Sequence, residues 1–205
     1  DPVVLDEADA KSALSVFGLD VPCSAVVSTD ADVMREGKQI GFPLVLKGRG
    51  IAHKTENGAV KLGITDSATL EDAVQGMDAK AFLVEEMIEE GVCELRVGVT
   101  RDPAHGFVLT LAAGGIFTQL LNDQLSLILP VGAKDVAVAL QKLKLYKLLA
   151  GYRGKPAANL DTITKAVMAV QDYVFAHINE VEEVEINPLM ATPKRAIAVD
   201  ALIRK

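Results

Sequence analysis

The chain contains 205 residues, enough to form one domain or two small lobes around a cleft. Its formal net charge is −7 at pH 7, which argues against a nucleic-acid-binding protein, because phosphate neutralisation requires Lys and Arg clustered over a wide face. Its longest apolar runs, such as residues 108–113, are far shorter than a membrane span, so we expect no membrane contact.

Two further features concern the setting of the protein. Cys23 and Cys93 are the only cysteines, each beside apolar residues and outside metal-ligand spacing, which predicts two reduced core thiols in a cytoplasmic protein. The first residue is Asp1 rather than Met, so we expect a segment of a longer polypeptide.

The first half of the chain predicts an α+β lobe. An acidic start, apolar residues at helical spacing and the following Gly18 predict a helix over residues 6–17. After Pro22, apolar runs alternate with stretches that have helical spacing. We expect strands at residues 26–27, 42–46, 60–64 and 81–87, and helices at residues 30–40 and 67–77.

The second half predicts another α+β lobe. Extended apolar runs precede the pair Gly114-Gly115 and continue after it. Two helical stretches follow, and two final strands are joined by residues 192–195. We expect strands at about residues 94–100, 107–111, 125–129, 182–190 and 197–203, and helices at residues 134–149 and 161–178.

Residues 45–60 combine basic groups with glycines directly after an apolar strand, a composition typical of a loop that handles phosphate. Lys47 ends the strand, where its ammonium can meet nucleotide phosphates, although a plain surface lysine fits the pattern equally well. The spacing of a P-loop and of a dinucleotide fingerprint is absent. The basic residues are Lys47, Arg49, His53 and Lys54, and the glycines are Gly48, Gly50 and Gly58.

His53 is the candidate for phosphate chemistry within this loop. It lies beside Lys54 rather than on an apolar face, so core packing explains it poorly. A neutral imidazole beside phosphate can act as a nucleophile or proton carrier, and a solvent-exposed loop histidine is the plain alternative. His105 and His177 fit a turn and a helix end, so we expect both to be structural.

A cluster of oxygen ligands is predicted near the C-terminus. Glu185 and Asn187 are two residues apart, hence on one face of a strand, with Ile186 on the other. Asp200 lies among apolar residues of the next strand, where an unpaired carboxylate is costly, and cross-strand pairing can bring it near Asn187. Carboxylate and amide oxygens suit Mg²⁺, whereas the alternative is an edge hairpin with solvated acids.

Taken in chain order, these motifs resemble the ATP-grasp domain of nucleoside-diphosphate-forming acyl-CoA synthetases, the family that includes ADP-forming acetyl-CoA synthetase and is related to succinyl-CoA synthetase. The resemblance covers nearly the whole chain, and the ordered set is specific although each motif alone is weak. It rests on residues 7–11, 47, 53–60, 83–87, 94–98, 101–103, 114–115, 151–154, 185–188 and 199–201.

The resemblance implies an ATP-grasp fold, in which two α+β lobes enclose a nucleotide cleft. Lobe A would span about residues 20–86, with the helix of residues 6–17 packed on it, and lobe B would span about residues 87–205. The ligands implied are ATP and Mg²⁺, with Lys47 on phosphate and the backbone of residues 85–88 on adenine.

The residue roles that the resemblance implies fall into three groups. Asn187 and Asp200 would hold Mg²⁺ with Glu185 as a helper, and His53 would relay phosphate. Glu94 would hold the ribose. The nucleotide-binding set is Lys47, Gly48, Lys54, Gly58, Glu85, Met87, Ile88, Glu94, Gly114 and Gly115.

The implied reaction is acid + ATP + CoA giving acyl-CoA + ADP + phosphate, through an acyl phosphate and a phosphohistidine. The chain would therefore be one module of an ADP-forming acid–CoA ligase. It would be incomplete without CoA-binding and ligase domains, in cis or as another subunit, through which coenzyme A and a small carboxylic acid would bind.

Two residues depart from the family's pattern. Gln119 stands where many relatives carry a carboxylate and would bind a cation more weakly, and Arg96 stands where we expect an apolar residue. The alternative function is therefore a nucleotide-sensing regulatory domain with weak or no transfer activity. An ATP-grasp carboxylate–amine ligase is a third hypothesis, disfavoured because it does not account for His53.

Overall fold

The computed structural model describes residues 3–49, 58–89, 91–115 and 122–205. The chain divides into two compact units, a smaller one of Pro22–Glu89 and a larger one of Asp1–Val21 with Glu90–Lys205. Each unit has its own core of buried apolar side chains. Within the described ranges, no helix has the length and hydropathy needed to cross a membrane.

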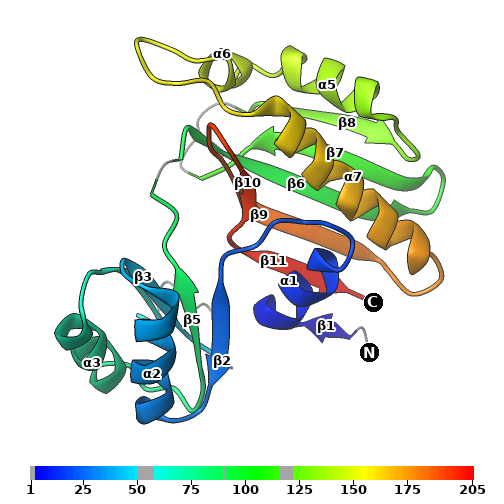
Figure 1. The fold of residues 1–205 in the computed structure, drawn as a ribbon. Coiled ribbons are helices and arrows are strands. Elements are labelled where there is room, and N and C mark those ends of the chain that lie inside the picture. Colours follow the sequence, from blue (N-terminus) through cyan, green and yellow to red (C-terminus); the bar gives the residue numbers. More distant parts are fainter. Residues whose placement is uncertain (1–2, 50–57, 90, 116–121) are drawn as a thin grey trace. The chain divides into compact units, whose positions relative to one another are not determined.

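The smaller unit is an antiparallel sheet with two helices on one face (Figure 1). Its elements are β2 (Ser24–Val27), α2 (Asp30–Ile40), β3 (Leu44–Gly48), β4 (Val60–Ile64), α3 (Ser67–Gln75) and β5 (Phe82–Glu86). The strand order is β2-β5-β3-β4. Leu44, Leu46 and Val84 are buried in one core with Leu70 of α3, and strand alternation therefore directs Lys47 to the opposite face.

Side-chain caps explain where the two helices of the smaller unit begin. The hydroxyl of Thr29 accepts a hydrogen bond from the N–H of Asp32 at 3.2 Å, at the start of α2. The carboxylate of Asp66 accepts from the N–H of Thr69 at 2.8 Å, and the hydroxyl of Thr69 accepts from the N–H of Asp66 at 3.2 Å. This reciprocal pair is a capping box at the start of α3.

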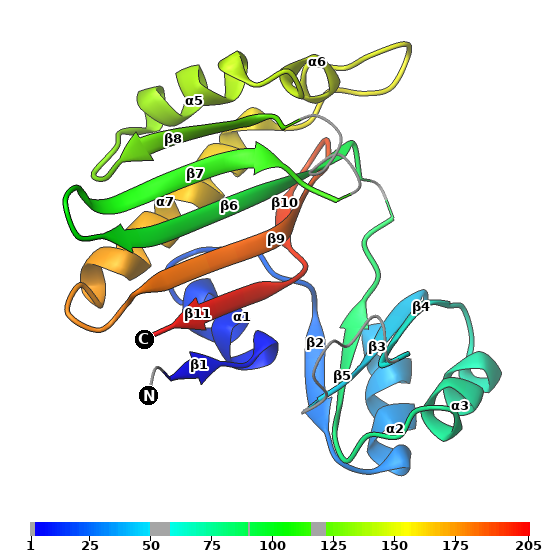
Figure 2. The same cartoon turned by 180° about the vertical axis from the view of Figure 1, so that it is seen from behind.

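The larger unit is an antiparallel sheet with helices α1, α5 and α7 on one face, as Figures 1 and 2 show from opposite sides. Its elements are β1 (Val4–Leu5), α1 (Glu7–Ser15), β6 (Cys93–Asp102), β7 (Gly106–Ala113), β8 (Gln124–Ile128), α5 (Ala133–Lys142), α6 (Tyr146–Leu149), α7 (Leu160–Ala176), β9 (Glu183–Ala191), β10 (Ala196–Ala198) and β11 (Ala201–Arg204). The order is β1-β11-β9-β6-β7-β8, and β10 pairs with β9. Leu95 and Val97 of β6 and Ile186 of β9 belong to the core beneath the helices. Because side chains alternate along a strand, Arg96 and Glu185, which adjoin them, lie on the other face of the sheet.

The N-terminal helix belongs to the larger unit, which corrects the expectation that it packs on the first lobe. Ala10 and Leu14 of α1 are fully buried in the larger core. The strand before the helix pairs with the last strand of the chain, with Val4 opposite Arg204. Helical periodicity identified the apolar face of residues 6–17, but periodicity does not identify the surface that buries such a face.

Two elements that were predicted as continuous are interrupted. The helix expected at residues 134–149 is divided into α5 and α6, because the buried carboxylate of Asp123 accepts hydrogen bonds from the N–H groups of Lys144 at 2.9 Å and Leu145 at 2.8 Å. The strand expected at residues 197–203 is divided into β10 and β11 by a two-residue bend.

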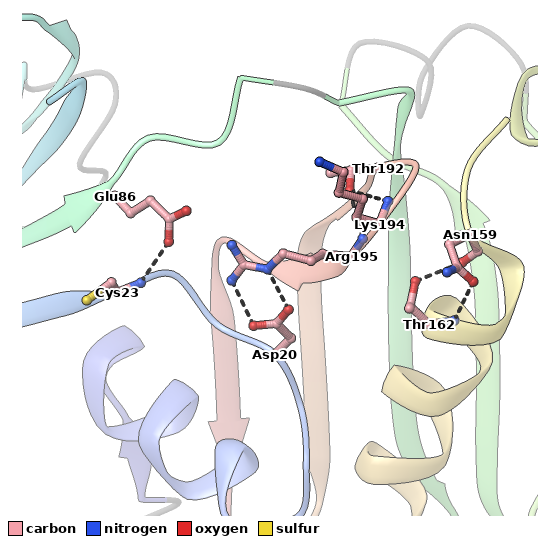
Figure 3. Close-up of polar contacts among 8 residues, drawn as sticks. All are labelled: Asp20, Cys23, Glu86, Asn159, Thr162, Thr192, Lys194 and Arg195. Carbon is pink, nitrogen blue, oxygen red and sulfur yellow. Dashed lines mark hydrogen bonds and ion pairs between the residues drawn. The ribbon is translucent and has the colours of Figure 1, made fainter. Parts of the chain in front are cut away.

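Only one of the two cysteines is a core thiol. Cys93 is buried in the larger unit, and this burial raises the pKa of its thiol to about 12. Cys23 is exposed, and its N–H donates to the carboxylate of Glu86 at 3.2 Å within the smaller unit (Figure 3). The prediction of two core thiols is therefore confirmed for Cys93 and wrong for Cys23.

The connection from β9 to β10 is the hairpin that the sequence predicted. The N–H of Thr192 donates to the carbonyl of Arg195 at 2.8 Å, and the hydroxyl of Thr192 accepts from the N–H groups of Lys194 at 3.1 Å and Arg195 at 2.8 Å (Figure 3). The guanidinium of Arg195 then donates to both carboxylate oxygens of Asp20, at 2.8 and 2.9 Å. This bidentate pair fastens the segment after α1 to the hairpin.

Candidate nucleotide and metal site

Glu185, Asn187 and Asp200 come together in the larger unit. Glu185 and Asn187 lie on the face of β9 away from the helices, while Ile186 is buried. The register of β9 with β10 and β11 sets Asp200 opposite Asn187, whose backbone N–H donates to the Asp200 carbonyl at 3.1 Å. The predicted cross-strand proximity is therefore confirmed. The side-chain amide of Asn187 also donates to Glu185 Oε1 at 3.4 Å, so the amide oxygen faces away from that carboxylate.

Asp200 is exposed, which corrects the argument that first singled it out. It was expected within a strand among apolar residues, where desolvation of a carboxylate is costly. It lies instead in the bend between β10 and β11, where the backbone turns its side chain toward solvent. Its place opposite Asn187, rather than a cost of burial, makes it a candidate ligand.

A bulge in β9 shapes the position of Asn187. The register of β9 with β6 shifts by one residue, so that Asn187 and Pro188 together oppose Arg96. A bulge of this kind bends the strand and re-aims a side chain, and bulges are frequent beside active sites. Pro188 suits the position because proline has no N–H to contribute to the ladder. Asn187 is accordingly exposed on a strand whose neighbouring positions are buried or half-buried.

Arg96 is the partner of Glu185. Its guanidinium lies 3.1 Å from Glu185 Oε2, and its Nε is a buried donor for which the described residues offer no acceptor. The unexpected arginine therefore neutralises the carboxylate that was predicted to help hold the metal. The positive charge beside Glu185 favours a role for this carboxylate in orienting Asn187 over direct coordination.

Among the residues that the structure describes, the donor set is incomplete for Mg²⁺ by itself and needs further ligands. Among the described residues, no three His, Cys, Asp or Glu side chains are close enough to form a metal cluster. The chain offers the amide oxygen of Asn187 and the carboxylates of Asp200 and Glu185, which are hard oxygen ligands. Mg²⁺ is commonly bound through one or two carboxylates together with substrate phosphates and water, and this chain matches that pattern.

Glu94, Gly114 and Gly115 are also brought together in the larger unit. The N–H of Gly114 donates to the carbonyl of Glu94 at 2.8 Å, and a Cβ on Gly114 would lie 2.9 Å from the backbone of Leu95. Gly115 has a φ of 58°, and the carboxylate of Glu94 occupies the place that its Cβ would need. Gly114 is therefore required by the close approach of the β6 backbone, and Gly115 is favoured by its positive φ. Gln119 lies outside the described residues.

Lys47 and Glu85 form a buried ion pair in the smaller unit. Lys47 Nζ lies 2.7 Å from Glu85 Oε2, and the side chains are 8% and 2% exposed. Glu85 was predicted to contact adenine through its backbone, and its side-chain pairing with Lys47 was not predicted. The available signal was a carboxylate directly after the apolar residues of β5, since a buried carboxylate requires a cation or hydrogen-bond donors.

Met87 follows β5 and is fixed within the smaller unit. Its N–H donates to the carbonyl of Pro43 at 3.1 Å, and its Sδ accepts from the N–H of Gly63 at 3.2 Å. An adenine contact through the Met87 N–H would therefore have to replace a hydrogen bond already made. Its carbonyl and the backbone of Ile88 are the groups that the adenine prediction then relies on.

The basic loop is described only at its ends. The N–H of Gly48 donates to the carbonyl of Ala59 at 2.8 Å, and Gly58 has a φ of 67°, a conformation that favours glycine. His53 and Lys54 lie outside the described residues. Their predicted roles therefore rest on the sequence.

Comparison with known proteins identifies the family. A family model for the ATP-grasp domain matches residues 2–204, so the chain belongs to the ATP-grasp family. It is 29% identical over 210 residues to the β subunit of ADP-forming acetate–CoA ligase I of Pyrococcus furiosus, covering 96% of this chain and 90% of that subunit. It is 28% identical to ADP-forming acetate–CoA ligase II of Archaeoglobus fulgidus, covering 98% of this chain but 30% of that enzyme.

Solved structures agree with this family. The fold matches the dinucleotide forming acetyl-coenzyme A synthetase 1 of Ca. Korarchaeum cryptofilum with a TM-score of 0.86 and 29% identity, covering 98% of this chain and 92% of that one. That protein was solved in complex with coenzyme A and Mg-AMPPCP, with its phosphohistidine segment pointing towards the nucleotide binding site.

Proposed function

We propose that the chain is the ATP-binding and phosphoryl-transfer module of an ADP-forming acyl-CoA synthetase. The observation that carries the proposal is the convergence of Glu185, Asn187 and Asp200 at a strand bulge. This oxygen-ligand group occurs in a chain that spans nine-tenths of an acetate–CoA ligase β subunit.

Asn187 and Asp200 would hold Mg²⁺ through their side-chain oxygens, and Glu185, paired with Arg96, would keep the Asn187 amide in position. Bound Mg²⁺ would neutralise charge on the phosphates during transfer. Because the described residues contribute few negative charges to this site, we expect the metal to bind mainly together with nucleotide.

The remaining candidates would hold the nucleotide. Lys47 would donate to phosphate oxygens from the end of β3, where Glu85 already fixes its ammonium. Glu94 would accept hydrogen bonds from ribose hydroxyls, with Gly114 and Gly115 allowing its approach. Lys54, Gly48 and Gly58 would surround the phosphates, and the backbone at Met87 and Ile88 would contact adenine.

His53 would receive the phosphoryl group. As the bond between the γ-phosphorus and the bridging oxygen breaks, a bond from an imidazole nitrogen to phosphorus forms, and ADP leaves with the bridging oxygen. The phosphoryl group would then pass to the carboxylic acid as an acyl phosphate, from which CoA displaces phosphate. CoA-binding and ligase domains, in cis or as another subunit, would carry out those later steps.

The test is phosphoryl capture by the intact protein. The protein would be incubated with γ-³²P-ATP and Mg²⁺, and acid-labile, base-stable label would be measured in wild type, His53→Ala and the matched control His105→Ala. His105 is an exposed turn residue that contacts Asp102, so it controls for the loss of a histidine. We expect label in wild type and His105→Ala and none in His53→Ala.

Two other results would have a different meaning. If wild type binds ATP but takes no label and forms no acyl-CoA from a panel of small acids, the regulatory domain is the better description. If the label persists in His53→Ala, the phosphoryl acceptor lies elsewhere and the role given to His53 is wrong.

A further inference from the structure

Lys11 of α1 is a buried cation that the proposed function does not use. Its side chain is 3% exposed, and its Nζ lies 2.9 Å from Oε1 of Glu7, which is 4% exposed and one helical turn earlier. The same ammonium donates to the carbonyl of Val199 at 3.2 Å, across 188 positions of sequence. Burial of two charges is costly unless both are well paired, so this arrangement calls for a structural or functional reason.

The strand ladder accounts for a side-chain donor at the Val199 carbonyl. The register between β9 and the segments β10 and β11 sets Val199 opposite Pro188, and the N–H of Val199 donates to the Pro188 carbonyl at 3.0 Å. At a hydrogen-bonded position of a regular antiparallel pair the opposite residue returns an N–H, but proline has none. The Val199 carbonyl therefore receives no N–H from Pro188, and the Lys11 ammonium donates to it.

The residue after Val199 is Asp200, the candidate metal carboxylate. The backbone at this bend is held by β9 on one side, through the hydrogen bonds of Asn187 and Pro188, and by α1 on the other, through Lys11. Loss of the α1 contact would leave the Val199–Asp200 peptide without one of its anchors. Loss of an interaction that orients a metal-ligating side chain commonly lowers metal affinity 10-fold to 100-fold.

We propose that Lys11, neutralised by Glu7, is a positioning residue that holds the Asp200 carboxylate for Mg²⁺. The inference rests on the proposed function, because it assumes that Asp200 is a metal ligand. It assigns the N-terminal helix a role in the metal site, although α1 contributes no ligand. Glu7 and Lys11 are the first and last residues of the 7–11 motif, to which the proposed function assigns no role.

The test replaces the ion pair without leaving a lone buried charge. In Glu7→Leu/Lys11→Leu, an apolar pair of similar volume occupies the site, a change that is often neutral or stabilising. Lys11→Arg retains a charged donor, and Lys134→Leu is the matched control at an exposed lysine of α5. Mn²⁺ affinity is measured in the intact protein with AMPPCP present, AMPPCP affinity is measured in EDTA, and amide hydrogen exchange is followed at residues 199–201.

We expect the double variant to bind Mn²⁺ about tenfold more weakly. Its AMPPCP affinity in EDTA should stay within about twofold of wild type, and exchange at residues 199–201 should rise. Lys11→Arg should recover most of the metal affinity, and Lys134→Leu should match wild type. A folded double variant with wild-type Mn²⁺ affinity and wild-type exchange at these amides would overturn the inference.

Failure of the proposed function has a different signature. In that case wild type itself shows no Mn²⁺ binding that depends on AMPPCP, and the positioning role falls with it. Exchange at residues 199–201 still reports whether Lys11 anchors the bend. If the double variant does not fold, Glu7→Gln/Lys11→Gln gives a comparable test, because it also removes both buried charges and leaves only a weaker, uncharged donor at that carbonyl.

Discussion

At the scale of single residues, the pair of Lys47 and Glu85 connects the stability of the smaller unit with its proposed ligand binding. Both side chains are nearly inaccessible, so each charge depends on its surroundings for the solvation that it loses. A nucleotide phosphate at Lys47 would add a second anion to a cation that is already paired. Glu85 therefore fixes where the ammonium lies before any ligand arrives.

We predict that Lys47→Met destabilises the protein by about 3–5 kcal/mol, because it leaves the Glu85 carboxylate buried without its cation. Lys47→Met/Glu85→Leu should recover most of this loss yet bind ATP as poorly as the single variant. Urea unfolding and nucleotide titration measure the two effects separately. ATP affinity near the wild-type value in the folded double variant would rule out a phosphate-binding role for Lys47.

The residues of the candidate metal site were predictable because oxygen-bearing side chains occur at the two-residue spacing that sets them on one face of a strand. The two-residue spacing of Glu185 and Asn187 sets them on one face, and the hairpin that follows brings Asp200 beside them. The ion-pair partner of each charged side chain in the site was not predictable from the sequence. Arg96 meets Glu185 across 89 positions, and such a contact depends on strand order, which local patterns do not encode.

At the scale of elements, the helices of the smaller unit begin where their caps predict. Their N-terminal residues carry the side chains that satisfy the first N–H groups, and this information is local in the sequence. The interruption between α5 and α6 is different, because the carboxylate that accepts the N–H groups there comes from Asp123, about twenty residues earlier. Helical periodicity continues through that interruption, so the sequence predicted one helix.

We predict that the Asp66 cap makes stability depend on pH. Hydrogen bonds from Thr69, first from its backbone N–H and then from its hydroxyl, lower the pKa of Asp66 below its usual value. The unfolded chain therefore binds this proton more readily, so the stabilisation is fully present above about pH 4, the ordinary pKa of Asp, and is lost as pH falls through the lower folded value.

The measurement is the thermal midpoint of wild type, Asp66→Asn and Asp66→Ala between pH 7 and pH 2. Asp66→Asn retains a capping oxygen but does not titrate, so the difference between wild type and this control isolates the charge. We expect that difference to favour wild type at neutral pH and to shrink as the solution is acidified. A difference that stays constant across the range would show that the charge contributes nothing.

At the scale of the whole chain, the smaller and larger units have separate hydrophobic cores. The N-terminal and C-terminal segments both belong to the larger unit. Residues from both the first and the last parts of the sequence form the larger core. Such an arrangement could not be deduced from periodicity, which is why the helix of residues 6–17 was assigned to the wrong unit. The ordered motifs that resemble the family are the same whichever unit this helix belongs to.

We predict that core cavities act on one unit at a time. Leu14 of α1 and Leu70 of α3 are both fully buried, one in each core. Leu14→Ala and Leu70→Ala should each destabilise their own unit by about 2–5 kcal/mol. Hydrogen exchange resolved along the chain should show faster exchange in the larger unit for the first variant and in the smaller unit for the second. Equal acceleration everywhere in both variants would mean that the chain unfolds as a single cooperative body.

The pairing of β1 with β11 has a consequence for how this module can be rearranged genetically. Val3 and Lys205 exchange backbone hydrogen bonds at 2.8 Å, so the two ends of the described polypeptide leave the sheet at the same point. A short linker could join them, and new ends could be opened in a turn such as the one between β6 and β7, giving a circularly permuted protein. For the same reason, a neighbouring domain encoded upstream or downstream would emerge from almost the same place on the surface, and gene order could change with little cost to the geometry of the module.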